Sequence, residues 1–291
     1  MKNFFCLLLF IVSVTFSNAQ STVLESESFK SEILKTDIRY SVFLPDGYKT
    51  SRRLYPVVYL LNGFTGNESD WIQFGDMQKI VDEGIANGDF PPMIIIMPDG
   101  DDRLYMNNHD NSYRYRDMFI EELIPYVEGK YLIRAEKEFR GISGLSMGGG
   151  GTLRLAMLNP ELFSAAAAYS SSVRTDEEIL ARDQSGFDDY SGRVLGTGLK
   201  GQDRFSDYYR KSYSLLDIAK TADVNQLNTV RFYFDCGDDD FLAVGNASLH
   251  IVMRQRGINH EYRVRDGAHS WDFWRTSLPI GLKFIGQSFT R

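Results

Sequence analysis

The chain has 291 residues, a formal net charge of −7 at pH 7 and no run of basic residues. An acidic chain of this kind is a poor ligand for nucleic acid or an anionic membrane surface, because both repel it. Its length suits one large α/β domain with a substantial core.

Residues 1–19 have the composition of a secretory signal peptide. Lys2 supplies a positive charge, an apolar run follows that is too short to span a bilayer comfortably, and residues 17–19 form a small-x-small cleavage site. We predict cleavage before Gln20 and a secreted or periplasmic protein with no stable membrane insertion. The alternative is an uncleaved membrane anchor.

The two cysteines do not suggest a covalent framework. Cys6 lies at the start of the apolar run, not at the cleavage site where a lipoprotein needs it, and cleavage leaves Cys236 alone. An intramolecular disulfide is therefore excluded in the mature chain.

The apolar pattern predicts strands and helices in alternation. Period-two alternation and then near-continuous apolar runs predict strands at residues 23–30, 37–45, 55–61, 93–97, 139–143, 164–169, 230–236 and 260–264. Helical spacing predicts helices at residues 76–86, 113–131, 152–158, 246–256 and 271–286. Alternation after an antiparallel start predicts an α/β fold, a mostly parallel sheet with helices on both faces.

Residues 171–214 break this alternation. They are rich in Gly, Asp, Arg and Tyr and show little clear periodicity. We predict a single domain over residues 20–291, with this segment as an insertion over the carboxyl edge of the sheet, where ligands bind in such folds. The alternative is a solvated excursion of the chain.

A G-x-S-x-G motif, residues 144–148, follows one predicted strand and precedes a helix. In this context the motif is typical of a nucleophile elbow, a tight turn that exposes a serine hydroxyl above the sheet. Side chains at Gly144 and Gly148 would collide across such a turn. The motif predicts Ser146 as a nucleophile, and the alternative is a glycine-rich structural turn.

A serine nucleophile needs a base, and His269 is the candidate. His269 lies in the loop between the last predicted strand and the last helix, which ends at the same edge of the sheet as Ser146. His250 lies within a predicted helix and His260 at a strand start, which suits structural roles, whereas His109 lies in a polar loop that can reach substrate.

The orienting acid is less well defined by position. Four aspartates, Asp235, Asp238, Asp239 and Asp240, lie at or beyond the end of one strand. Asp235 is still within that strand, which favours a structural role, and spacing alone does not choose among the other three.

An oxyanion requires two backbone donors. The N–H of Met147, directly after the nucleophile, is one candidate. The N–H of Phe64, after Gly63 in the turn that follows strand 55–61, is the other, and the alternative there is an ordinary strand-end turn.

No cofactor or metal is expected. Four scattered histidines and the cysteines give no zinc-ligand spacing, residues 99–102 lack the EF-hand pattern, and the glycines at 148–151 lack a Walker lysine.

At these motifs the chain resembles the putative-esterase family of α/β-hydrolases, which includes feruloyl and acetylxylan esterases of carbohydrate esterase family 1, tributyrin-type esterases and esterase D, the S-formylglutathione hydrolase. The resemblance covers nearly the whole predicted mature chain. It is carried by residues 60–63 with 70–71, 97–100, 144–149, 236–242 and 267–271 with Trp274.

The resemblance implies an α/β-hydrolase fold and identifies Asp240, the last aspartate of the G-x-x-D pattern, as the acid. One position departs from the family pattern: Asn62 stands where a histidine usually precedes the glycine. The family histidine is structural, so activity is expected to be retained.

The resemblance also implies the reaction, hydrolysis of an acyl or feruloyl ester through an acyl-enzyme intermediate, and an acylated plant-wall carbohydrate as substrate. Tyr190, Tyr208 and Tyr209 of the insertion are suited equally to stacking on sugar or phenolic rings and to packing. The alternatives are an acyltransferase of the mycolyltransferase type, a thioesterase like S-formylglutathione hydrolase, for which a signal peptide is unsuited, and a non-catalytic carbohydrate-binding protein.

Overall fold

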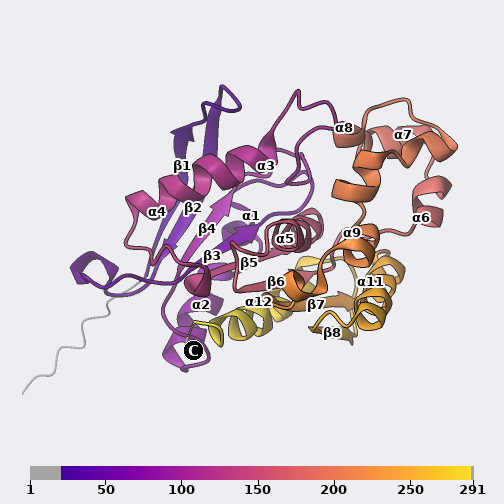
Figure 1. The fold of residues 1–291 in the computed structure, drawn as a ribbon. Helices are drawn as coiled ribbons and strands as arrows, with labels where there is room; N and C mark the ends of the chain where they lie inside the picture. The colour runs from indigo at the N-terminus through magenta and orange to yellow at the C-terminus, as the bar shows by residue number, and fades with distance from the viewer. Residues whose placement is uncertain (1–20, 290–291) are drawn as a thin grey trace, which may run out of the picture.

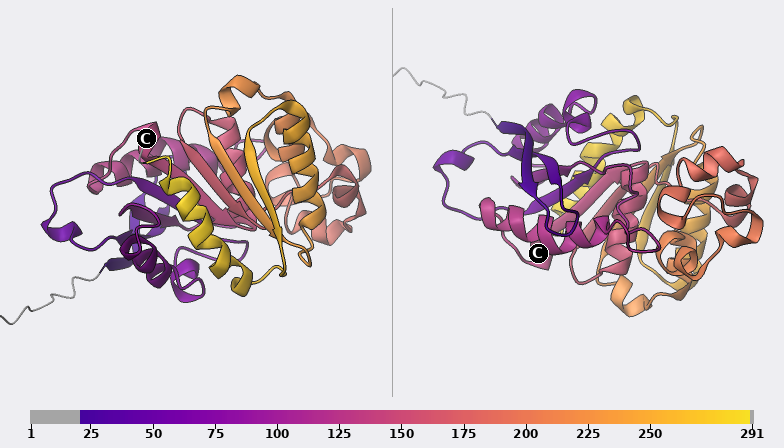
Figure 2. Two further views of the ribbon diagram at one scale, coloured as in Figure 1. Left: turned by 90° about the horizontal axis from the view of Figure 1, so that it is seen from below. Right: turned by 90° about the horizontal axis from the view of Figure 1, so that it is seen from above.

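The computed structural model describes residues 21–289 and shows one eight-stranded sheet (Figures 1 and 2). The strand order is β1-β2-β4-β3-β5-β6-β7-β8, antiparallel for β1, β2 and β4 and parallel thereafter. The strands are β1 (Thr22–Lys30), β2 (Asp37–Leu44), β3 (Val57–Leu61), β4 (Ile94–Pro98), β5 (Arg140–Leu145), β6 (Ala165–Tyr169), β7 (Arg231–Gly237) and β8 (His260–Arg265). The predicted α/β architecture is confirmed, while the predicted signal peptide lies outside the described residues.

Helices cover both faces of the sheet (Figure 2). One face packs against α2 (Met77–Ala86) and α12 (Trp271–Gly286). The other packs against α5 (Met147–Leu158), α9 (Leu215–Thr221), α11 (Ala243–Arg256) and the helical segment of residues 115–130. Short helices fill the connections: η1 (Tyr48–Thr50), α1 (Asp70–Gln73), η3 (Lys137–Phe139) and α10 (Val224–Leu227).

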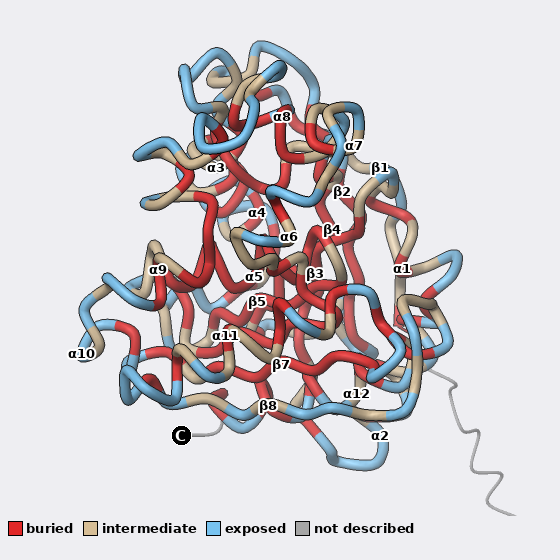
Figure 3. Tube along the Cα trace, turned by 90° about the vertical axis from the view of Figure 1, so that its right-hand side faces the viewer, coloured by how far each residue is buried: buried red, intermediate tan, exposed pale blue. Residues whose placement is uncertain are grey.

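The sheet separates two apolar cores. In β3, Val58 and Leu60 join the core under α2 and α12. Val57, Tyr59 and Leu61 join the core on the other face. Because successive strand residues point to opposite faces, a strand covered on both sides must be apolar throughout, which explains the continuous run at residues 57–61. Figure 3 shows the central strands buried and the peripheral connections exposed.

The helix after Ser146 begins earlier than predicted. Glycine has the lowest helix propensity apart from proline, so residues 148–151 carry no helical signal in the sequence. The helix was predicted at 152–158 but begins at Met147, so the prediction is wrong at its start. Almost every side chain of α5 is buried. The helix lies against neighbouring backbone at these glycines, and tertiary packing overrides their poor propensity.

The predicted helix at 113–131 is present but not uniform. It consists of α3 (Tyr115–Met118), a π-helical turn η2 (Phe119–Leu123) and α4 (Ile124–Lys130). Pro125 lies in the first turn of α4, where its missing N–H is best tolerated.

The weak periodicity of residues 171–214 suggested an irregular segment, but the structure shows a series of short helices there. These are α6 (Asp176–Ala181), α7 (Gln184–Asp188), α8 (Gly192–Leu195), η4 (Gly201–Arg204) and the π-helical η5 (Tyr209–Tyr213). Each is shorter than the window in which a helical period is visible.

Two buried arginines hold this insertion in place. Arg154 of α5 donates to the carbonyl of Tyr213 at 3.0 Å, which joins the insertion to the central helix. Arg204 donates to the carbonyls of Ile179 and Arg182 at 2.7 and 3.0 Å and stacks on Phe187. Residues 171–214 are therefore packed against α5 and against one another.

None of the helices between residues 21 and 289 has the length and apolar character needed to cross a membrane.

Candidate active site

Ser146 sits at a strained turn between β5 and α5. Its backbone has φ 53° and ψ −115°, a conformation that side-chain-bearing residues adopt rarely. A Cβ on Gly144 would lie 2.7 Å from the carbonyl oxygen of Gly148, the predicted collision across the turn. A Cβ on Gly148 would lie 2.5 Å from the Leu61 carbonyl oxygen of the adjacent strand, so this glycine serves packing against β3.

Ser146, His269 and Asp240 form one hydrogen-bonded chain. The Ser146 Oγ lies 2.9 Å from His269 Nε2, and His269 Nδ1 lies 2.8 Å from Asp240 Oδ2. With the Nδ1 proton donated to the carboxylate, Nε2 is the acceptor for the serine hydroxyl. The structure thus brings together three predicted residues that are up to 123 positions apart in the chain.

The geometry separates the four aspartates. Asp235 is buried in β7, where it pairs with Arg265 at 2.8 Å. Asp238 accepts the N–H of Gly267 at 3.0 Å, and Asp239 is exposed. Asp240 is the one that reaches His269. The expectation of a structural role for Asp235 agrees with these contacts.

Asp240 is held as a buried carboxylate. Burial by itself raises the pKa of this group, but hydrogen bonds from His269 and Ser170 and from the N–H of Leu242 outweigh burial and leave the pKa below its usual range. The carboxylate is therefore ionised at neutral pH and available to stabilise an imidazolium.

Ser170 is a site residue that the sequence analysis missed. It follows β6 directly, is fully buried and has a positive φ of 45°. Its hydroxyl lowers the pKa of Asp240 and accepts the indole N–H of Trp274 at 3.1 Å. Ser170 therefore favours the ionised form of Asp240 and anchors Trp274, whose ring contacts His269. The only sequence signal was its place at the end of a central strand.

We expect Ser170→Ala to lower kcat by roughly tenfold, because it removes the hydroxyl that favours ionised Asp240 and leaves the Trp274 N–H without its acceptor, and an unsatisfied buried donor costs about 1–3 kcal/mol. Alanine keeps the Cβ and removes only the hydroxyl. The measurement is steady-state hydrolysis of 4-nitrophenyl acetate, with Ser164→Ala as control, since the Ser164 hydroxyl bonds the Arg140 carbonyl at the opposite end of the strand. Equal kcat in the two variants would remove Ser170 from the site.

The imidazole of His269 is packed between two aromatic rings. Phe241 lies at 4.5 Å between ring centroids, and Trp274 lies edge-on at 4.9 Å. The side chain of His269 remains 18% exposed. The ring is thus held in orientation while its Nε2 edge remains accessible.

The two residues predicted to supply oxyanion donors, Met147 and Phe64, are both near Ser146. Met147 is the first residue of α5, so its N–H has no acceptor within the helix. A Cβ built on Gly63 would lie 3.7 Å from the Ser146 Cβ, which places the turn carrying Phe64 against the nucleophile. The helix N-terminus adds positive potential at the same point.

Asn62 braces this turn from within. Its buried side chain donates to the Gly63 carbonyl at 2.9 Å and accepts from the Gly100 N–H and the Tyr105 hydroxyl at 3.1 and 2.7 Å. Both hydrogen-bonding ends of the amide are used. The departure from the family histidine therefore leaves a position that still fixes the turn.

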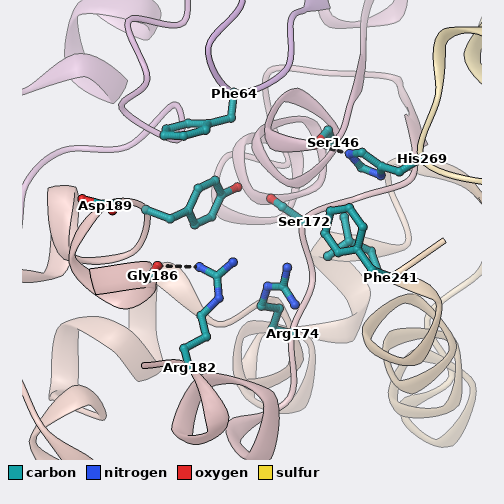
Figure 4. Close-up of a pocket in the computed structure, with 11 residues that line it drawn as sticks. Phe64, Ser146, Ser172, Arg174, Arg182, Gly186, Asp189, Phe241 and His269 are labelled. Atoms are coloured by element: carbon teal, nitrogen blue, oxygen red, sulfur yellow. Dashed lines mark hydrogen bonds between the residues drawn. The ribbon is translucent and has the colours of Figure 1, made fainter. Parts of the chain in front are cut away.

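A cavity of about 360 Å³ opens at Ser146 (Figure 4). This volume lies within the range of small-molecule sites. Its walls are Phe64, Ser146, Ser172, Arg174, Arg182, Gly186, Asp189, Tyr190, Phe241, Leu242 and His269. Six of these residues come from the insertion, so the insertion forms much of the wall facing the serine.

Of the three tyrosines that the sequence suited equally to stacking on substrate or to packing, one lines the cavity and two make contacts within the protein. Tyr209 is buried, stacks on Tyr213 and donates to Asp176, which is packing. Tyr208 donates to the Asn107 carbonyl. Tyr190 lines the cavity and packs on Phe64, with ring centroids 5.0 Å apart.

The remaining histidines lie elsewhere. His250 and His260 are hydrogen-bonded to each other at 2.8 Å, and His109 packs near Gly196 outside the cavity wall. Within residues 21–289, no group of three or more His, Cys, Asp or Glu side chains is placed to hold a metal ion.

Comparison with known proteins gives a consistent result. The model of a family described as Putative esterase matches residues 31–285. An acetyl esterase of Caldicellulosiruptor saccharolyticus is 26% identical over 241 residues, 79% of this chain and 83% of that protein. An esterase of Mycobacterium tuberculosis is 30% identical over 82% of this chain, which spans 54% of that protein's length. The structure of a ferulic acid esterase matches with a TM-score of 0.78 and 30% identity, covering 94% of this chain and 100% of that one.

Proposed function

The chain belongs to the putative-esterase family and is a carboxylic ester hydrolase, and on that premise we propose that it works by a serine mechanism. The observation that carries the proposal is the hydrogen-bonded chain Ser146–His269–Asp240 at the mouth of a cavity. A nucleophile, a base and an orienting acid in this order are the elements of acyl transfer.

In the first half-reaction the Ser146 Oγ attacks the ester carbonyl carbon, and His269 Nε2 takes the serine proton. Asp240 stabilises the imidazolium, while the N–H groups of Met147 and Phe64 hold the oxyanion of the tetrahedral intermediate. The bond from carbon to the alcohol oxygen then breaks. His269 gives its proton to that oxygen, and the acyl group remains on Ser146.

Water completes the reaction by the same route. His269 takes a proton from a water molecule, whose oxygen attacks the acyl carbon. Collapse of the second intermediate returns the proton to the Ser146 oxygen and releases the carboxylic acid. No redox step or cofactor enters this balance.

We propose acetyl or feruloyl esters of plant-wall carbohydrate as the substrates. The support is the acetyl esterase and ferulic acid esterase among the similar proteins. A further support is the aromatic lining, Phe64, Tyr190 and the 60% exposed Phe241, which offers flat surfaces for a phenolic acyl group or a sugar ring.

A substrate panel tests this proposal. Methyl ferulate, acetylated xylan and 4-nitrophenyl acetate are compared by kcat/KM, with products identified in the presence and absence of an acceptor sugar. We expect free acid as the product throughout. Acyl transfer to the sugar as the main reaction would indicate an acyltransferase instead.

We further propose that the protein acts outside the cytoplasm. The support is the signal-like composition of residues 1–19. Expression in a bacterial host followed by N-terminal sequencing is expected to give an exported chain beginning at Gln20, whereas an intact Met1 in the membrane fraction would contradict export with cleavage.

A further inference from the structure

Two arginines line the cavity that opens at Ser146. Arg174 lies between β6 and α6, and Arg182 directly follows α6. Figure 4 shows both guanidinium groups pointing into the cavity, on the side opposite Phe64. The wall of a substrate site thus carries two positive charges that the proposed hydrolysis does not use.

Neither guanidinium is closely paired with a carboxylate. Arg174 Nη1 lies 3.9 Å from Glu178 Oε1, beyond hydrogen-bond length, and the other Glu178 oxygen accepts the N–H of Thr175 at 2.8 Å. Arg182 donates to a neutral acceptor, the Gly186 carbonyl, at 3.0 Å. Asp189 is the acidic residue of the wall, and its Oδ2 accepts from Ser185 at 3.1 Å.

The charges of the two arginines oppose each other. Burial lowers the pKa of Arg174, and the charge of Arg182 lowers it further. Two like charges in a partly buried wall destabilise each other unless an anion lies between or beside them. Glu178 offsets part of the charge of Arg174 from 3.9 Å, and a negatively charged occupant of the cavity would relieve the repulsion that is left between the two arginines.

Each of the two arginine side chains packs against an aromatic ring of the cavity wall. The guanidinium of Arg174 lies over Phe241 at 5.4 Å, and that of Arg182 lies over Tyr190 at 5.4 Å. Arg204 holds the backbone carbonyl of Arg182 at 3.0 Å. Planar guanidinium groups held on aromatic faces are well suited to carboxylate recognition, because less side-chain freedom is lost on binding.

We infer that the ester substrate carries a carboxylate, bound by Arg174 and Arg182 while the ester carbonyl lies at Ser146. This inference rests on the proposed function and narrows its substrate class to anionic esters. The carboxylate belongs either to the alcohol, as in a uronic acid residue that is acylated on a hydroxyl group, or to the acyl group, as in a dicarboxylic acid half-ester that takes the place of an acetyl or feruloyl ester.

Two matched substrate pairs separate these sources. The acyl pair is mono-4-nitrophenyl suberate, whose chain is too long for its carboxylate to attack its own ester readily, and its methyl-capped neutral analogue, followed by nitrophenolate release above the enzyme-free rate. The alcohol pair is 4-acetoxybenzoate and methyl 4-acetoxybenzoate, followed by chromatography of the phenol formed. We expect kcat/KM for the anion to exceed that for the neutral partner at least tenfold in one pair, less so at 0.5 M than at about 0.05 M salt because the contact is ionic.

The arginine variants connect that preference to the cavity. Arg174→Gln and Arg182→Gln are each expected to lower the anion-to-neutral ratio of kcat/KM at least fivefold, and the double variant is expected to bring it near one. Arg134→Gln is the matched control. It removes the same charge from an exposed arginine that stacks on Phe139, before the first residue of β5 and away from the cavity.

Each outcome has a separate meaning. Turnover of the neutral esters with no preference for the anion in either pair, or a preference that survives the double variant, overturns the inference and leaves the proposed function intact. Absence of turnover for every ester contradicts the proposed function itself. Thermal unfolding of the variants identifies any loss that comes from misfolding.

Discussion

Ser146→Ala is expected to abolish ester hydrolysis, with kcat falling by about 10⁵- to 10⁶-fold, the loss typical of removing a serine nucleophile. The reason is chemical, since no other hydroxyl lies at 2.9 Å from His269 Nε2 within the described residues. Alanine keeps the Cβ at this turn, so the strained backbone meets no new atom. The measurement is 4-nitrophenyl acetate turnover beside a thermal unfolding curve.

Labelling by a fluorophosphonate provides an independent readout of the same residue. The wild-type protein is expected to be labelled at Ser146 and the variant to remain unlabelled. Ser172→Ala is the matched control, because Ser172 is the other serine in the cavity wall and its removal is expected to leave the label in place. Retained turnover or labelling in a folded Ser146→Ala protein contradicts the nucleophile assignment.

The sequence could predict that Ser146 and His269 lie together, because both stand in short motifs with a fixed place in the topology. Ser146 follows a buried strand and opens a helix, and His269 follows the last strand of the same parallel sheet. The carboxyl ends of parallel strands meet at one edge, so these residues had to be near each other. Asp240 needed the family resemblance, since four aspartates within six positions lie near that edge.

Other site residues had no such signal. Ser170 is one of three consecutive serines, and what distinguishes it is its effect on the pKa of Asp240 and its hydrogen bond with Trp274. Arg174 and Arg182 lie in a segment without visible period, and tertiary contacts such as those of Arg204 determine where they point. Sequence patterns report local structure, whereas these positions depend on contacts between segments far apart in the chain.

Asp240→Asn is expected to lower kcat by about 10⁴-fold, as in other triads where the acid becomes an amide. The carboxylate accepts the Nδ1 proton of His269 at 2.8 Å. An amide can present its NH₂ group to Nδ1 instead, which moves the ring proton to Nε2 and removes the acceptor for the Ser146 hydroxyl. The position of the groups is retained while the tautomer is wrong, so KM is expected to change much less than kcat.

The pH dependence of thermal stability provides a second test of Asp240. The pKa of Asp240 is lowered in the folded protein, so its ionised form adds stability that is present above the unfolded carboxyl pKa of about 3.9 and lost as pH falls through the folded value. The difference in melting temperature between wild type and Asp240→Asn is therefore expected to be larger at pH 7 than at pH 3.

The neighbouring aspartates are the controls for the loss in kcat. Asp239 is exposed, so Asp239→Asn is expected to stay within about twofold of wild type, because surface changes away from special contacts are usually small. Asp238 accepts the Gly267 N–H in the loop that carries His269, so Asp238→Asn is expected to show an intermediate loss. Similar small losses in all three variants would contradict Asp240 as the acid, because only its carboxylate controls which nitrogen of His269 is free to accept the serine proton.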